Sequence, residues 1–152
     1  MNDRYLYRAK RTDNGEWVEG NLVWSDDADD DYKAIIIPTT GSNMFTTGWP
    51  NGDLGFEKWY RVDPSAICQC TGLKDKNGKL IWENDILVGY LDDMYPENAT
   101  YAQVIWDKNG FYTKEQYSDD ISLMDEFDEK HFEVCGNIFD NSELLEVREN
   151  DT

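Results

Sequence analysis

Basic residues, histidine and long apolar runs are scarce in this chain of 152 residues. Fourteen Lys and Arg stand against 32 Asp and Glu, and the formal charge of −18 repels nucleic-acid phosphates and anionic lipids alike. The longest apolar run, residues 34–37, is far shorter than the ~20 residues of a membrane helix. With no basic and apolar leader after Met1, we expect a cytoplasmic protein that binds neither membranes nor nucleic acid directly.

The motifs of the common enzyme classes are also missing. The chain has no G-x-S-x-G elbow, no G-x-x-x-x-G-K-[ST] loop and no G-x-G-x-x-G fingerprint. Its one histidine, His131, lies between an acidic segment and a predicted strand, where a structural or exposed role is favoured. We predict no catalytic residue, no cofactor and no enzymatic activity. A carboxylate-pair hydrolase stays open as an alternative, although so many acids produce pairs by chance.

Metal-binding patterns are incomplete. The chain contains a formal Cys₃His set, made of Cys68, Cys70, His131 and Cys135. The spacing of Cys68 and Cys70 does not fit zinc knuckles, because one residue separates them and knuckles place two to four residues between paired ligands. An EF-hand register that begins at Asp27 ends on Pro38, where the motif needs a glutamate. We therefore predict no metal site, and reduced, metal-free thiols.

Turn and strand signals dominate what is present. Asn-Gly pairs at 14–15, 77–78 and 109–110 each lie between apolar segments, and this is the strongest short-range signal for a hairpin. Residues 34–37, 101–106 and 132–139 also read as strands. Leu123, Met124 and Phe127 have helical spacing, which predicts one short acidic helix within 118–130, capped by Ser118 or Asp119.

Two further segments complete the pattern. Residues 39–55 mix Thr, Gly, Asn and Pro with aromatics, so we expect an irregular segment whose aromatics pack onto a sheet. A last short helix, capped by Ser142, is expected to end near Glu146. The fold class is therefore mainly β, or α+β with one or two short helices, and it starts with an N-terminal hairpin subdomain.

Several segments resemble the YopX family, small proteins of phage and prophage genomes. They are WVEG at 17–20, VDP at 62–64, TGLKDKNGK at 71–79, ENDI at 83–86 and EVCGNIFDNSELL at 133–145. The chain departs from the family pattern at Asn84 and Ser142, where the family usually has Gly and often Pro, and in its three cysteines.

The resemblance implies an SH3-like barrel in the C-terminal half and brings no established activity. We expect an N-terminal β subdomain at 1–62, the barrel at 63–148 and a tail at 149–152. The residues that we expect to maintain the structure are Gly72, Asp75, Asn77, Gly78, Asp85, Gly136 and Asn137.

Acidic runs and aromatics in polar loops are the remaining candidates for function. Solvated loops are the ordinary interpretation of such runs, but acids around exposed aromatics also mark protein interfaces. The candidate partner-binding residues are Asp27, Asp29, Asp30, Asp31, Trp49, Tyr95 and Tyr112.

These candidates lead to a hypothesis about function. We predict a phage or prophage accessory protein, in the host cytoplasm if phage-encoded, that binds a protein partner of basic character. A homo-oligomer is compatible with the sequence. The third hypothesis is an acidic DNA mimic that inhibits a nucleic-acid-binding host protein.

Overall fold

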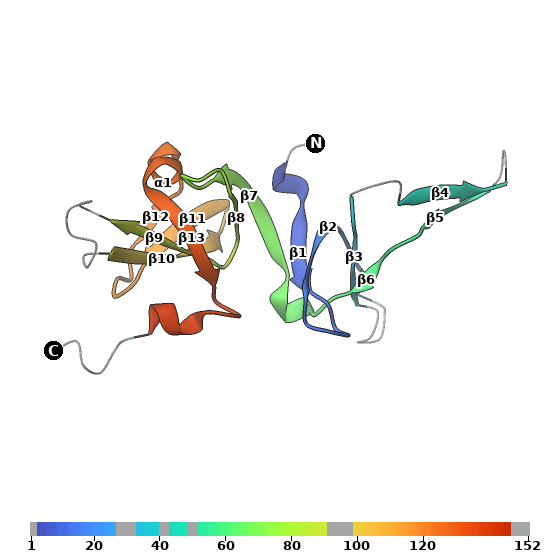
Figure 1. The fold of residues 1–152 in the computed structure, drawn as a ribbon, viewed down its shortest axis with the longest axis horizontal. Coiled ribbons are helices and arrows are strands. Elements are labelled where there is room, and N and C mark those ends of the chain that lie inside the picture. The colour runs from blue at the N-terminus through green and yellow to red at the C-terminus, as the bar shows by residue number, and fades with distance from the viewer. Residues whose placement is uncertain (1–2, 27–32, 40–42, 49–51, 91–98, 147–152) are drawn as a thin grey trace. The chain divides into compact units, whose positions relative to one another are not determined.

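The computed structural model describes residues 3–26, 33–39, 43–48, 52–90 and 99–146 (Figure 1). The chain divides into two compact units, Met1–Gln69 and Cys70–Thr152. Three antiparallel sheets and one short α-helix make the described part mainly β, as predicted. No helix of the described residues is long and apolar enough to cross a membrane.

The first unit is an antiparallel sheet in which β6, β3, β2 and β1 lie in that order. The predicted N-terminal hairpin is confirmed, because β1 (Tyr7–Lys10) pairs with β2 (Trp17–Trp24) around the first Asn-Gly turn. The strand predicted at 34–37 is β3 (Ala34–Ile37), and it pairs with β6 (Tyr60–Arg61). Ala9, Ala34, Ile36 and Val62 form the buried core.

A separate two-stranded ribbon occupies part of the segment that was expected to be irregular. β4 (Met44–Thr47) pairs with β5 (Asp53–Phe56), so that expectation was wrong for residues 44–47 and 53–55. The aromatic Phe45 does not pack onto the main sheet either. It is 43% exposed and lies over its cross-strand partner Gly55, where a Cβ atom would come within 2.6 Å of the ring.

The described residues of the first unit also form the 3₁₀ turns η1 (Asp3–Tyr5) and η3 (Pro64–Ala66). The side chain of Asp63 caps η3 by accepting a hydrogen bond from the Ser65 backbone N–H at 2.9 Å. The chain then enters β7 (Cys68–Lys74), whose first two residues pair with β1.

The second unit begins with the predicted hairpin at 75–78, which is confirmed. β7 pairs with β8 (Leu80–Trp82), and Gly78 has the positive φ of 83° that this turn needs. A five-stranded sheet follows, built from β9 (Asp85–Tyr90), β10 (Ala99–Asp107), β11 (Gly110–Glu115), β12 (Ile121–Leu123) and β13 (Phe132–Asn137).

The strand order in this sheet is β12-β11-β10-β9-β13, so four strands form a meander and the fifth pairs back on the first. Within the described residues the pairing does not close into a barrel. Ile81, Leu87, Val104 and Met124 form the buried core, against which half-buried apolar side chains pack.

The helix of the second unit is shorter than expected. α1 covers Glu126–His131 only, and its cap is Asp125 rather than Ser118 or Asp119. Residues 121–123 form β12 instead, because they pair with β11. The last short helix is the 3₁₀ turn η5 (Ser142–Leu145), which begins after Asn141 rather than after a capping Ser142.

Candidate functional site

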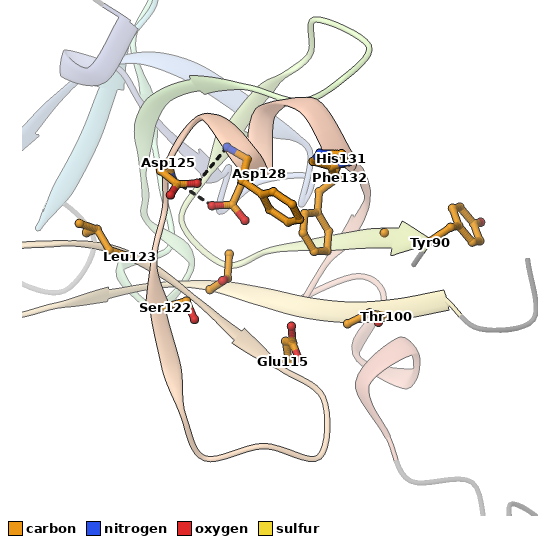
Figure 2. Close-up of a pocket in the computed structure, with 12 residues that line it drawn as sticks. Tyr90, Thr100, Glu115, Ser122, Leu123, Asp125, Asp128, His131 and Phe132 are labelled. Carbon is orange, nitrogen blue, oxygen red and sulfur yellow. Dashed lines mark hydrogen bonds between the residues drawn. The ribbon is translucent and has the colours of Figure 1, made fainter. Parts of the chain in front are cut away.

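A pocket of about 500 Å³ opens on the second unit. Its floor comes from β9, β10, β11 and β12, and its wall comes from α1 and the start of β13. The polar side chains that line it are Thr100, Thr113, Glu115, Ser122, Asp125 and Asp128 (Figure 2). The unit's only histidine, His131, also lines it.

The floor continues the face of the sheet that carries the core. Because side chains alternate along a strand, Thr113 lies on the same side of β11 as Phe111, which packs against the core. Thr113 is paired with the core residue Val104 on one side and with Ser122 on the other. Along this face of the sheet, the apolar core side chains are therefore followed by the hydroxyl groups of Thr113 and Ser122 and the carboxylate of Glu115.

Gly89 gives the pocket its shape at the other end of the floor. It pairs with Thr100 and with Phe132, and the Phe132 ring lies over it. A Cβ atom at this position would be only 2.7 Å from the ring. A side chain here would push Phe132 away, so the absence of a side chain sets the position of this wall.

The wall is fixed by a capping box at the start of α1. The Asp125 carboxylate accepts a hydrogen bond from the Phe127 backbone N–H, and the Asp128 carboxylate accepts one from the Asp125 N–H, both at 2.9 Å (Figure 2). Asp128 is 7% exposed, and burial raises the pKa of its carboxyl above the ordinary value. The pocket thus holds one shielded acid and two more accessible ones, Glu115 and Asp125.

Two large apolar side chains stand at the pocket with most of their surface in solvent. Leu123 is 61% exposed and Phe127 is 58% exposed. The Phe127 ring lies 4.2 Å from the His131 ring, measured between centroids. Exposed acids lie close to both in the chain, and we call the whole set the acid-rimmed surface: Asp119, Asp120, Ile121, Leu123, Asp125, Glu126 and Phe127.

The candidate partner-binding residues of the sequence fall mostly outside the described residues, namely Asp27, Asp29, Asp30, Asp31, Trp49 and Tyr95. Tyr112 is described, and it is half-buried on β11 opposite Leu123. It does not line the pocket, because its neighbours Phe111 and Thr113 occupy the core side of the strand.

Asp75 joins the turn at 75–78 to the last strand of the sheet. Its carboxylate accepts hydrogen bonds from the backbone N–H groups of Asn77, Lys79 and Val134, each at 2.9 Å. The Asn77 side chain donates to Glu133 at 2.9 Å. One acid therefore ties two segments together that are far apart in the sequence.

The other expected structural residues lie at turns and bulges. Gly72 has a positive φ of 81° in β7, and buried Asp85 accepts a hydrogen bond from the Trp82 N–H at 2.8 Å. Gly136 lies at the shift of register in β13, where a Cβ atom would come within 2.5 Å of the Asn141 side chain. The Asn137 side-chain oxygen accepts hydrogen bonds from the backbone N–H groups of Phe139 and Asp140.

The cysteines are placed in two environments. Cys68 and Cys70 are buried on one face of β7, and Cys135 is exposed on β13. Among the described residues, no three His, Cys, Asp or Glu side chains come together in a group that could hold a metal ion.

Sequence reasoning missed the pocket and most of its lining. Thr113, Glu115 and Ser122 carry no motif, because a hydroxyl or carboxylate on a strand is an ordinary surface residue. The available signal was the alternation of Phe111, Thr113 and Glu115, which places three residues on one face.

The YopX protein family model matches residues 6–146, which include almost all of the described residues of both units. The chain belongs to the YopX family. Its structure is similar to the crystal structure of protein EF1440 from Enterococcus faecalis, with a TM-score of 0.61 and 28% sequence identity. That match covers 92% of this chain and 96% of the other. A comparison with curated proteins gave no match. The YopX family as a whole brings no characterised function.

Proposed function

We propose that this YopX-family protein is a non-enzymatic module that binds another protein through the acid-rimmed surface of its second unit. The observation that carries the proposal is the exposure of Leu123 and Phe127 beside a pocket and among acids. Exposed apolar side chains within a polar rim are typical of protein interfaces. The role as a phage or prophage accessory protein belongs to the same proposal.

Charge favours a basic partner. The net charge of −18 attracts cations at long range and repels phosphates, so the acids around the apolar pair select basic protein surfaces. The contact itself comes from burying Leu123 and Phe127, since charges at a rim contribute more to association rate than to affinity.

The test compares two equally exposed apolar pairs. The Leu123→Ser/Phe127→Ser variant removes the proposed surface. Its control is Met44→Ser/Leu54→Ser on the β4–β5 ribbon, whose side chains are 64% and 58% exposed. Affinity capture from a lysate of the host, followed by calorimetry with the captured protein, should show at least a tenfold loss of affinity for the first variant only.

Two results would contradict the proposal. Loss of the partner with the ribbon variant alone would move the interface to the first unit. Equal capture by both variants and the unmodified protein would show that neither apolar pair binds it.

A carboxylate-pair hydrolase is the second candidate, and one observation favours it. Asp128 is a buried acid with a raised pKa in the same pocket as Glu115, as a general acid and its partner carboxylate would be. Its carboxylate already accepts the Asp125 N–H, which supports a structural role instead. Turnover of a chromogenic glycoside that disappears in both Asp128→Asn and Glu115→Gln would establish the hydrolase.

The finer fold is part of the proposal too. We propose that 63–148 form an SH3-like barrel, supported by a fifth strand that returns to pair with the first around one core. The DNA-mimic alternative requires a regular row of carboxylates on one surface. The run at 27–31 lies outside the described residues, so that alternative stays a prediction.

A further inference from the structure

The open edge of β12 and the pocket beside it point to one mode of binding. We propose that an extended, basic segment of the partner pairs with β12 as an added strand and places one Arg or Lys side chain in the pocket. This inference rests on the proposed function, because it specifies how the acid-rimmed surface would take its partner.

β12 has one side free for pairing within the described residues. It is the end strand in the order β12-β11-β10-β9-β13. The Met124 N–H donates to the Phe111 carbonyl at 3.1 Å, and hydrogen-bonded pairs alternate along an antiparallel ladder. The next such pair is therefore Thr113 with Ser122, which turns the backbone N–H and C=O groups of Ile121 and Leu123 away from β11. An edge of this kind is a template for another strand.

The direction of side chains then connects the edge to the pocket. Ser122 and Leu123 both line the pocket. By alternation, the side chains of Ile121 and Leu123 project from β12 on the opposite side from Ser122, so the exposed Leu123 lies at the edge of the pocket. In an added strand, the residue opposite Ser122 shares its face, with Cβ atoms about 5 Å apart. A long side chain at that position reaches the pocket, and its two neighbours lie beside Ile121 and Leu123.

The chemistry of the pocket selects a cation. Its acids are Glu115, Asp125 and Asp128, and its lining contains no Lys or Arg among the described residues. Thr113 is only 6% exposed and lines the pocket, yet no described residue makes a hydrogen bond with its hydroxyl. This hydroxyl oxygen can therefore accept a hydrogen bond from a cationic donor that enters the pocket.

A guanidinium or ammonium group satisfies these atoms together. It donates to carboxylate and hydroxyl oxygens and accepts none, and the rings of Phe127 and Phe132 on the wall favour a cation by cation–π attraction. His131 is the remaining titratable group that lines this wall. Asp119 and Asp120, which directly precede β12, attract further basic residues of the same segment.

The experiment uses a positional-scanning library of blocked hexapeptides as the probe. We expect enrichment of Arg or Lys at one position and of β-branched or apolar residues at the positions on either side. In the best peptide, replacing that Arg by neutral citrulline should weaken binding at least tenfold. N-methylation of the two backbone amides that face β12 should weaken it by a similar factor, since the added strand loses its donors.

Matched protein variants test the two parts separately. Ile121→Pro removes an outward N–H without breaking the ladder to β11, and Ile121→Thr keeps that N–H. Only the proline variant should lose peptide binding, with thermal melting as the check that both fold. Glu115→Gln should reduce the preference for Arg over citrulline, whereas the matched control Glu143→Gln, outside the pocket, should not.

The outcomes separate this inference from the proposed function. Peptides without basic enrichment, or peptides that bind equally well when N-methylated, would overturn it. So would a library with no binder at all, if a captured partner still depends on Leu123 and Phe127, and the proposed function would then stand. The peptides could bind as expected while the captured partner binds the Leu123→Ser/Phe127→Ser variant as tightly as the unmodified protein. That result would support the peptide site at β12 and contradict the proposed function.

Discussion

At the scale of single residues, Asp75 shows how one buried carboxylate can hold a turn and a distant strand together. Its buried carboxylate accepts hydrogen bonds from three backbone N–H groups, two in its own turn and one at Val134, which is 59 positions further along the chain. A buried N–H that loses its acceptor costs more free energy than the average hydrogen bond contributes, because desolvation is no longer offset. The turn and β13 are therefore stabilised together.

We predict that Asp75→Ala lowers the free energy of unfolding by about 2 to 4 kcal/mol. Asp75→Asn should cost less, because the amide keeps one oxygen acceptor. The measurement is urea unfolding, with Asp120→Ala at an exposed position as the control, expected within about 0.5 kcal/mol of the unmodified protein. A loss for Asp75→Ala no larger than that of the control would show that water replaces the carboxylate.

Gly78 provides a second prediction, which concerns the backbone alone. Its φ is 83°, and a Cβ atom there would meet nothing within 4 Å, so steric clash with neighbours is absent. Gly78→Val should still destabilise the protein by about 1 to 2 kcal/mol, because β-branched residues rarely adopt positive φ. Gly78→Asn should cost least of the substitutions. Equal melting temperatures for the Val and Asn variants would contradict this account.

At the scale of elements, the segment 118–131 marks the limit of sequence reasoning. Leu123, Met124 and Phe127 have helical spacing, yet Leu123 ends β12, Met124 is buried in the core and Phe127 is exposed on α1. The same spacing therefore fits a strand followed by a short helix. What decided between them was the pairing of 121–123 with β11, a long-range contact that local periodicity does not contain.

Hairpins were predictable for the opposite reason. An Asn-Gly turn and its two strands form a local signal, so the hairpins around Gly15 and Gly78 could be placed from a few residues each. The β4–β5 ribbon was missed although the sequence carries the same signal, because Asn51-Gly52 stands between its two strands and the surrounding Thr, Gly and Pro favoured an irregular segment instead. The pocket could not be predicted either, because Thr113, Ser122 and Asp128 converge only through the register of the sheet and the capping box of α1.

The helix α1 carries a prediction on pH. Burial raises the pKa of Asp128 above its ordinary 3.8, so the native state holds this proton more tightly than the unfolded chain does. The associated stability is fully present below pH 3.8 and is lost as pH rises through the raised native pKa. Asp128→Asn stays neutral and keeps an oxygen to accept the Asp125 N–H.

The variant should therefore gain stability relative to the unmodified protein as pH rises from about 3 to about 7. Urea unfolding at several pH values measures this difference. A difference that is constant, or that changes in the opposite direction, would show that the capping box stabilises the Asp128 carboxylate more than burial destabilises it.

At the scale of the whole molecule, charge links the two acidic runs to the choice of partner. One run, 27–31, lies outside the described residues, and the other borders the pocket and the edge of β12. If only net charge mattered, neutralising either run would slow association with a basic partner equally. If the acid-rimmed surface is the binding site, charges near it should matter more, since steering falls off within a Debye length of about 8 Å at physiological salt.

We predict that replacing Asp119, Asp120, Asp125 and Glu126 by their amides slows association with a basic partner several-fold at low salt and makes it less sensitive to added salt. The matched variant neutralises Asp27, Asp29, Asp30 and Asp31, which is the same change in net charge, and its effect should be smaller. Stopped-flow measurement across a salt series gives both rates, and Asn at position 125 keeps the cap of α1. If neutralising Asp27, Asp29, Asp30 and Asp31 has the larger effect, the interface lies at that run. Trp49, Tyr95 and Tyr112 are then the next residues to substitute.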